Sequence, residues 1–269
     1  MRKLFIVLVL TIGLFGCANS KSQTLKIAAT SVPHAEILEV AKPILKSEYN
    51  VDLDIVVVQD YVTPNKFLAS GDVDANFFQH IPYFESQISD FGYDFTNVGG
   101  IHIEPIGVYS KEYDNISDLP DGATIIFSSS VADHGRILSL LEVAGLIEID
   151  PTVIKINAEV KDIVSNTKNF IFKSDIEASL LPTAFNNSEG DAVIINTNYA
   201  LQAGLNPLQD AILIENEKSL YVNIIAVTTE NKEDENILNL VNVLQSETIK
   251  DFIISNYEGA VVPVGEPNS

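Results

Sequence analysis

Positive charge and cysteine are both scarce in this sequence. Its 269 residues include 16 Lys and Arg against 37 Asp and Glu, which gives a formal net charge of −21. A chain this acidic lacks the basic surface that binds the phosphates of a nucleic acid, so we expect no nucleic-acid partner. The single cysteine cannot form a disulfide within the chain, which excludes a fold held together by internal disulfides.

Familiar catalytic and nucleotide-binding motifs are absent as well. The sequence has no G-x-S-x-G, no Walker loop, no G-x-G-x-x-G and no H-E-x-x-H segment. Its one cysteine follows an export signal, described next, where lipidation would remove it as a nucleophile. We therefore expect a protein that is not an enzyme and that requires no cofactor.

The start of the chain carries the features of an export signal. Two basic residues precede an apolar run at 4–15, which is too short to span a bilayer. The run leads into Leu-Phe-Gly-Cys, which resembles the lipobox of bacterial lipoproteins; the alternative is an ordinary export signal with a chance cysteine. We predict a lipoprotein signal peptide at 1–16, lipidation of Cys17, and a lipidated tether at 17–24. The chain would then be anchored to a bacterial cell membrane on its extracytoplasmic face.

Strand-like and helix-like patterns alternate along the rest of the chain. This alternation predicts an α/β architecture with largely parallel sheets, and the length fits two α/β lobes with a ligand cleft between them. Strands are predicted at 24–30, 51–58, 72–78, 96–110 (one or two strands), 123–129, 152–157, 169–173, 191–196, 221–229 and 259–264. Helices are predicted at 31–49, 63–71, 82–90, 134–144, 176–185, 198–203 and 234–256.

Four histidines raise the hypothesis of a metal-binding lipoprotein. His102 and Glu104 alternate onto one face of a predicted strand. However, no two histidines have the i, i+4 spacing of a helical metal site, and Zn²⁺ needs three or four convergent ligands. We therefore assign no metal ligands and keep a Zn²⁺- or Mn²⁺-binding lipoprotein of an ABC importer as the alternative function.

Six segments, taken in order, are similar to the landmarks of one family. They are "QDYVTPN" (59–65), "DANFFQHIPYFE" (74–85), "GIHIEPIGVYS" (100–110), "HGRILSLLEVAGLI" (134–147), "AVIINTNYALQAGLNP" (192–207) and "YVNIIAV" (221–227). Together they span nearly the whole mature chain, and their order resembles that of the methionine-binding lipoprotein family. Members of this family are the substrate-binding components of methionine ABC importers.

The resemblance implies a type II periplasmic-binding-protein fold. In this fold two hinge crossings join two α/β lobes, and the ligand binds in the cleft. The first lobe would comprise 25–107 and 222–269, and the second lobe 108–221. The implied function is capture of L-methionine, or of a close relative such as a methionine-containing dipeptide. The implied partners are the permease of an ABC importer and its ATPase, and the protein would act as a monomer.

Two segments depart from the family pattern. The family usually has an "NDP"-like segment ahead of its Gly-Arg pair, where this chain has "SSSVADHGR" (128–136), and Thr183 stands where a "LPR"-like segment is common. The first departure lies close to the expected carboxylate-binding residue. The exact ligand is therefore left open among methionine and its relatives.

Three polar residues match the family's ligand contacts. Arg136 corresponds to the arginine of the Gly-Arg motif, and a guanidinium can hold a carboxylate through two parallel donors. The alternative is a surface arginine in the first turn of a helix, where the helix dipole disfavours a cation. Asn196 and Asn223 interrupt apolar strand-like runs, so each either faces the cleft or caps a strand end. Asn198 is expected to cap a helix.

By the same match, four residues form the wall around the ligand side chain: Tyr61, Phe78, His80 and Tyr83. A thioether packs well on polarisable aromatic rings. Alternation along "ANFFQH" puts Phe78 and His80 on one face of a strand and Phe77 on the other, in the core. His80 has a second interpretation as a buried histidine or a helix cap.

Overall fold

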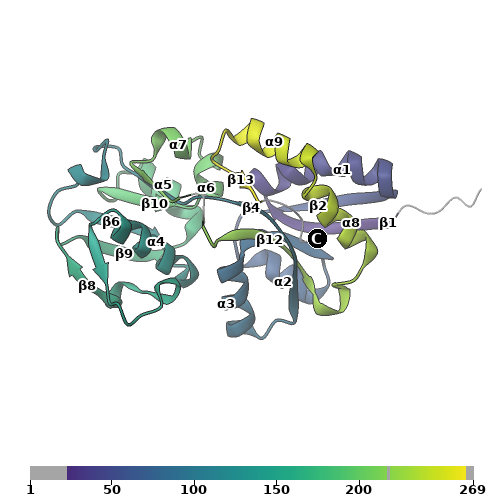
Figure 1. Cartoon of the computed structure of the whole chain (residues 1–269), viewed down its shortest axis with the longest axis horizontal. Coiled ribbons are helices and arrows are strands. Elements are labelled where there is room, and N and C mark those ends of the chain that lie inside the picture. The colour runs from purple at the N-terminus through teal and green to yellow at the C-terminus, as the bar shows by residue number, and fades with distance from the viewer. Residues whose placement is uncertain (1–22, 217–218, 265–269) are drawn as a thin grey trace, which may run out of the picture.

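Two β-sheets flanked by helices form the cores of two α/β lobes that lie side by side (Figure 1). The computed structural model describes residues 23–216 and 219–264. The predicted signal peptide, Cys17 and most of the predicted tether lie outside the described residues, and Gln23 and Thr24 already belong to the first strand. Within the described part of the chain, no helix has the length and apolar character that crossing a membrane requires.

The first lobe is built on a six-stranded mixed sheet. Its strands are β1 (Gln23–Thr30), β2 (Val51–Val58), β3 (Ala75–His80), β4 (Phe95–Ile103), β12 (Val222–Thr228) and β13 (Val262–Pro263). They lie in the order β13-β4-β12-β3-β1-β2, with β1 parallel to β2 and β3 and with β12 antiparallel to β3 and β4. Its helices are α1 (Glu36–Tyr49), α2 (Thr63–Ser70), α3 (Ile81–Phe91), α8 (Glu235–Leu244) and α9 (Glu247–Tyr257).

Helices cover both faces of this sheet, because successive strand residues point to opposite faces and both sets are apolar. On β1, Ile27 and Ala29 pack in one cluster with α1, α8 and α9, whereas Ala28 packs in another with α2 and α3. Phe77 is fully buried in the first of these clusters. The predicted core position of Phe77 is therefore confirmed.

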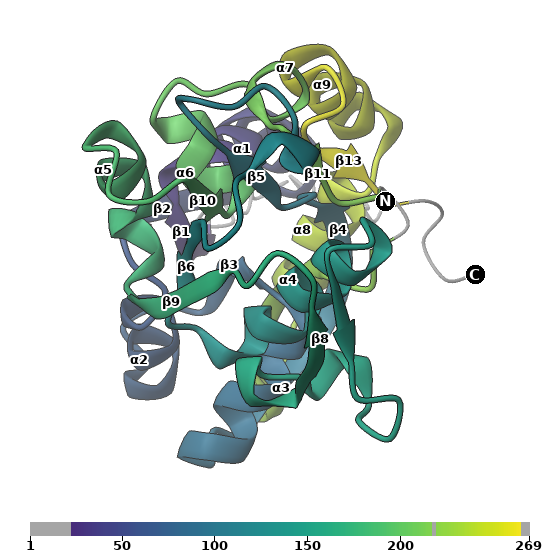
Figure 2. The same cartoon turned by 90° about the vertical axis from the view of Figure 1, so that its left-hand side faces the viewer.

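The second lobe is built on a five-stranded mixed sheet, which faces the viewer in Figure 2. Its strands are β5 (Gly107–Tyr109), β6 (Thr124–Ser128), β9 (Ile171–Ile176), β10 (Ala192–Ile195) and β11 (Leu213–Ile214), and β7 (Ile147–Ile149) and β8 (Ile163–Asn166) form a separate pair. Its helices are α4 (Val131–Val143), α5 (Leu181–Asn186), α6 (Thr197–Gln202) and α7 (Pro207–Asp210). The sheet order is β11-β5-β10-β6-β9. Strand β6 is parallel to both of its neighbours, β9 and β10. Strand β5 is antiparallel to both of its neighbours, β10 and β11.

The chain crosses between the two sheets twice. The first crossing lies between β4 and β5, and the second lies between β11 and β12. After the second crossing β12 inserts between β3 and β4, so the first sheet is completed only after the second lobe has been formed. This return makes the first sheet mixed, and the antiparallel pairing of β5 makes the second sheet mixed, which corrects the prediction of largely parallel sheets.

One predicted element in the second lobe is wrong, and another starts later than predicted. No strand forms at 152–157, where the chain instead makes a single 3₁₀ turn at Lys155–Asn157. Ile154 is 70% exposed there and Val153 is only partly buried against the core, so the apolar run does not form a buried strand. The helix predicted at 176–185 begins only at Leu181, because β9 continues to Ile176 and a 3₁₀ turn follows it.

The single helix predicted at 234–256 is two helices, α8 and α9. Ser246 between them has extended backbone angles, φ −68° and ψ 156°. The break redirects the chain so that Ile249 reaches the same apolar cluster as Leu240 of α8. At the break, the side chain of Gln245 donates to the carbonyl oxygen of Gly100 at 2.9 Å, which ties this point to β4. Packing on the sheet therefore outweighs the continuous helical pattern.

Gly135 in α4 permits a close backbone contact. A Cβ at this position would lie 2.3 Å from the carbonyl oxygen of Ile156 and 2.5 Å from that of Lys155. Both atoms belong to the backbone of the 3₁₀ turn, so no side-chain rotation can relieve the clash. Gly135 therefore sets the spacing between this turn and the helix that carries Arg136.

Gly135→Ala is expected to lower the free energy of unfolding by about 2 kcal/mol, although alanine is the better helix former. Urea unfolding at neutral pH measures the change. Val143→Ala on the same helix is the control, because its side chain is 86% exposed, and its effect should stay within about 0.5 kcal/mol. Equal effects of the two substitutions would contradict the role of the close contact.

Candidate functional site

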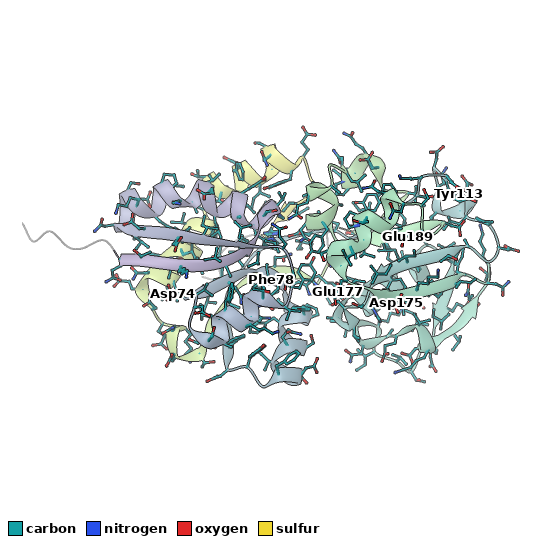
Figure 3. The ribbon with its side chains drawn as sticks, turned by 180° about the vertical axis from the view of Figure 1, so that it is seen from behind. Asp74, Phe78, Tyr113, Asp175, Glu177 and Glu189 are labelled. Atoms are coloured by element: carbon teal, nitrogen blue, oxygen red, sulfur yellow. The ribbon has the colours of Figure 1, made fainter. Side chains whose placement is uncertain are left out.

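A small cavity lies between the lobes. All seven residues that the sequence predicts as ligand contacts line it: Tyr61, Phe78, His80, Tyr83, Arg136, Asn196 and Asn223. Five further residues complete the lining: Gln79, Glu104, Asp133, Thr197 and Asn198. Figure 3 labels Phe78 of β3 near the junction of the lobes and Glu177 across from it on the second lobe. The structure brings the seven residues together, and their contact with a ligand stays a prediction.

Hydrogen bonds join the two lobes across the cavity. His80 at the end of β3 lies 3.0 Å from Asp133 of α4, measured from Nε2 to Oδ1. The hydroxyl of Tyr61 donates to Oδ1 of Asn198 at 2.6 Å. Asn198 was expected to cap a helix, but it lies inside α6 and contacts Tyr61 of the first lobe, because the cap position is taken by Asn196. The lobes therefore meet through polar side chains that surround the cavity.

Three aromatic rings form one wall of the cavity. The ring centroids of Tyr61, Phe78 and Tyr83 lie 6.1, 6.0 and 6.0 Å from one another, so they make a nearly regular triangle. The hydroxyl of Tyr83 donates to the backbone carbonyl of Tyr61 at 2.9 Å. With the hydroxyls of both tyrosines engaged by the protein, the rings present apolar, polarisable surface to the cavity.

His80 is both a helix cap and a cavity residue. Its Nδ1 accepts the backbone N–H of Tyr83 at 3.1 Å in the first turn of α3, which satisfies one of the free donors at the helix start. Since Nδ1 is an acceptor, Nε2 carries the proton in the neutral ring and donates to Asp133. The helix cap thus sets which hydrogen bond His80 makes across the cavity.

Asp133 is buried and remains ionised. Burial by itself would raise the pKa of Asp133, but the hydrogen bond from His80, the charge of Arg136 and the amide of Asn196 outweigh it and lower the pKa to about 2. Its Oδ2 accepts from Nδ2 of Asn196 at 3.1 Å. A buried, ionised carboxylate is stabilised by a positively charged partner, so Asp133 is a candidate partner for a ligand ammonium group.

Arg136 places a buried guanidinium next to Asp133 at the cavity, and the sequence holds only one other arginine, Arg2. Its Nη2 donates to the carbonyl oxygen of Glu104 at 2.9 Å and to Glu215, and the ring of Tyr221 lies 4.3 Å from its Cζ. Burial opposes the charged form, but Glu215 and Asp133 outweigh it, so the pKa of Arg136 is raised. The side chain is fully charged and held from several directions.

Two asparagines offer opposite ends of their amides to the cavity. Nδ2 of Asn196 is used by Asp133, and its Oδ1 is buried without a hydrogen-bond partner among the described residues. Oδ1 of Asn223 on β12 lies 3.2 Å from Nε2 of His34, which leaves its Nδ2 for other partners. Asn196 is therefore available as an acceptor, and Asn223 is available as a donor.

A buried cluster of two histidines and one glutamate lies beside Asn223. Oε1 of Glu104 is 2.8 Å from Nε2 of His102 and 3.3 Å from Nε2 of His34. Burial lowers the pKa of His34 to about 4 and that of His102 to about 3, so both rings are neutral at pH 7. Burial raises the pKa of Glu104. The side chains of His102 and Glu104 meet as predicted, although β4 ends at Ile103, so Glu104 lies just beyond the strand.

This cluster also has the composition of a metal site. One ligand atom from each of His34, His102 and Glu104 lies within 4.8 Å of the others. Nδ1 of His34 is 2.7 Å from the hydroxyl of Thr30, a second contact of the kind that orients a metal-binding imidazole. Nε2 of His102 already has a hydrogen-bond partner in Glu104, and Nε2 of His34 has one in Asn223, so the arrangement is also complete without an ion.

Two charged residues of this region escape the sequence prediction, Asp133 and Glu215. Asp133 lies three residues before Arg136, a spacing that puts an acid and a base on the same side of a helix and that could have signalled it. Glu215 has no comparable signal in the sequence, because its contact with Arg136 depends on the path of the second crossing.

Comparison with known proteins shows the family to which the chain belongs. A family model described as NlpA lipoprotein matches residues 25–265. The chain is 46% identical to the methionine-binding lipoprotein MetQ of Bacillus subtilis (strain 168), over 99% of this chain and 100% of that one. The crystal structure of a pheromone cOB1 precursor and YaeC-family lipoprotein from Enterococcus faecalis V583 is 48% identical, with a TM-score of 0.87 over 90% of this chain and all of that one.

A third relative was solved with a ligand. The nutrient binding protein from Burkholderia cenocepacia bound to methionine is 37% identical, with a TM-score of 0.84 over 89% of this chain and 99% of that one. These solved structures confirm the predicted type II periplasmic-binding fold. The chain belongs to the NlpA lipoprotein family, whose relatives here are substrate-binding proteins and not an enzyme class.

Proposed function

We propose that the protein is the lipid-anchored, substrate-binding component of an ABC importer. It captures L-methionine, or a close relative such as a methionine-containing dipeptide, and delivers it to the permease and its ATPase. One observation carries the proposal: a single cavity places a guanidinium, a carboxylate and two amides beside three aromatic rings. This combination offers a partner for each part of an amino acid that has a long, polarisable side chain.

The ligand carboxylate is assigned to Arg136 and Asn223. Arg136 supplies a buried positive charge and an Nε donor without a protein partner among the described residues. The Nδ2 group of Asn223 is a second donor, because its Oδ1 already contacts His34. A carboxylate needs this kind of charge-assisted donor set to compensate for the loss of water.

The ligand ammonium group is assigned to Asn196 and Asp133. The free Oδ1 of Asn196 accepts one hydrogen from the ammonium, and the ionised Asp133 supplies the opposite charge. The side chain then extends toward Tyr61, Phe78 and Tyr83, with His80 as a flat, polar-edged neighbour. The relative from Burkholderia cenocepacia, solved with methionine, supports a ligand of this size and chemistry.

The remaining features follow from the same function. Acylation of Cys17 would hold the protein on the extracytoplasmic face of a bacterial cell membrane, with 17–24 as the tether. We place the first lobe at 25–107 and 222–269 and the second at 108–221, closing on the ligand as a monomer. The names of the relatives, which are lipoproteins, support the anchor.

Binding of L-methionine is expected to raise the melting temperature. Free ligand at a hundred times Kd adds about 2.7 kcal/mol, which corresponds to roughly 5 to 10 °C for a chain of this size. Differential scanning fluorimetry with L-methionine, D-methionine, methionine-containing dipeptides and L-alanine measures the shift and ranks the ligands. No shift with any amino acid or dipeptide, beside a clear shift with Zn²⁺, would refute the proposal.

Binding of Zn²⁺ or Mn²⁺ is the second candidate function, favoured by the cluster of His34, His102 and Glu104. Metal analysis of the purified protein separates the two candidates. A metal receptor would retain about one equivalent of ion and lose it in His34→Ala. His134→Gln is the matched control, because His134 lies outside the cluster and bonds to the backbone of Ser128.

A further inference from the structure

Glu215 contacts Arg136 but does not line the cavity. Its carboxylate accepts the backbone N–H of Ile106 on the first crossing at 3.2 Å and the hydroxyl of Ser219 on the second at 3.0 Å. Its own N–H donates to the carbonyl oxygen of Ile106 at 2.9 Å. Both crossings therefore fix this carboxylate against the guanidinium that is assigned to the ligand.

Arg136 is incompletely satisfied despite these contacts. Its Nη2 is shared between Glu215 and the carbonyl oxygen of Glu104, and Tyr221 covers the guanidinium at 4.3 Å. Its Nε is buried and has no hydrogen-bond partner in the described part of the chain. Because an unpaired buried donor is costly, the guanidinium retains a demand for one more acceptor.

Charges of both signs meet at this end of the cavity. One guanidinium faces two carboxylates, since Nη1 of Arg136 lies 3.7 Å from Oδ1 of Asp133 while Nη2 pairs with Glu215. The side chains of Arg136 and Asp133 are only 3% and 2% exposed, so water screens their charges weakly. Because the charge of Glu215 neutralises that of Arg136, the negative charge of Asp133 remains for a ligand to balance.

We propose that Glu215 is a specificity-determining residue that restricts the site to ligands carrying an ammonium group as well as a carboxylate. This inference rests on the proposed function, in which the ligand binds at Arg136. The charge of Glu215 weakens the electrostatic attraction between Arg136 and a ligand carboxylate. For a ligand without an ammonium group, the remaining attraction does not overcome the repulsion between its carboxylate and Asp133. A zwitterion avoids that repulsion, because its ammonium group meets Asp133.

Glu215→Gln tests the charge while the hydrogen bonds are kept. The Oε1 of glutamine can accept from Arg136 and from the N–H of Ile106, and its Nε2 can donate to the hydroxyl of Ser219. The exchange keeps these contacts, with the hydroxyl of Ser219 turned from donor to acceptor. We therefore expect this variant to fold, and its circular dichroism and melting curve verify this.

Calorimetric titration with three probes measures the effect. The probes are L-methionine, 4-(methylsulfanyl)butanoic acid, which lacks the ammonium group, and L-methioninol, which lacks the carboxylate. In Glu215→Gln, the affinity for the acid relative to L-methionine should rise about tenfold over the wild-type ratio, and the relative affinity for L-methioninol should fall. A residue that only supported the fold would change all three affinities together.

Two further variants complete the test. Glu230→Gln removes the same charge from an exposed position on the first lobe and should leave the ratio unchanged. Ser219→Ala removes one hydrogen bond to the Glu215 carboxylate but keeps its charge, so it should shift the ratio in the same direction by a smaller factor. This variant provides the test if Glu215→Gln fails to fold. Unchanged ratios in both Glu215→Gln and Ser219→Ala, with L-methionine still bound, overturn the inference. Wild-type protein that binds none of the probes overturns the proposed function instead.

Discussion

Arg136→Ala is expected to weaken binding of L-methionine at least a hundredfold, about 3 kcal/mol. The substitution removes the buried positive charge assigned to the ligand carboxylate. It also leaves Glu215 and Asp133 without their cation, so the cavity becomes strongly negative and repels a carboxylate. Calorimetric titration well below the melting temperature measures the loss, and the thermal shift caused by L-methionine should disappear.

Arg136→Lys separates charge from geometry. Lysine keeps the positive charge but cannot make two parallel hydrogen bonds, so its affinity should lie between those of wild type and Arg136→Ala. Lys161→Ala is the control for the loss of a positive charge, because its side chain is 69% exposed on the second lobe. Affinity for L-methionine that survives in Arg136→Ala within a factor of three would show that the carboxylate binds elsewhere.

Between pH 7 and pH 5, the free energy of unfolding of the wild-type protein is expected to fall by about 2 kcal/mol more than that of the His102→Gln variant. Burial lowers the pKa of His102 to about 3, whereas a histidine in the unfolded chain titrates near 6.5. Below pH 6.5 His102 binds a proton in the unfolded chain but not in the folded protein. The free energy of unfolding therefore falls by about 1.4 kcal/mol per pH unit until the folded pKa is reached.

His34 acts in the same direction, since its pKa is lowered to about 4, and Glu104 acts against both because its pKa is raised. The difference between wild type and His102→Gln isolates His102 from these neighbours. Urea unfolding at pH 7, 6 and 5 measures it. Glutamine can still donate to Glu104, as the imidazole does at 2.8 Å, so the variant keeps this hydrogen bond.

Phe77→Leu is the control for destabilisation without titration. Phe77 packs against His102 with the ring centroids 5.3 Å apart, so its substitution disturbs the same part of the core. The variant should be less stable at every pH but keep the wild-type dependence on pH. If His102→Gln also kept that dependence, the buried histidine would not be the group that takes up the proton.

Local patterns predicted much of the fold because they are enforced by burial on both faces of the sheets. Alternation in "ANFFQH" placed Phe77 in the core and Phe78 at the cavity, and both lie there. The helix predicted from Pro82 begins one residue earlier, at Ile81, and its cap is His80. The same reasoning failed at 152–157, because an apolar run does not reveal whether its neighbours leave room for another strand.

The site was predicted in part from family motifs and in part missed. Each of the seven predicted contacts lies in a motif with its own sequence pattern, and all seven line one cavity. Asp133, which bonds to two of them, falls in the segment that departs from the family pattern. Glu215 could not be found from sequence, because an acid on a crossing resembles any exposed loop residue until its distance to Arg136 is known.

By itself the sequence determined the class of protein: an acidic α/β chain without the familiar catalytic motifs, with an order of segments similar to one family of binding proteins. Periodicity and composition fix such features because they depend on short-range patterns and on charge. Only the tertiary structure decided how the charges of the cavity are partnered. Asp133, Glu104 and Glu215 reach Arg136 and the histidines from α4 and from the two crossings, and those distances arise only when both sheets are assembled.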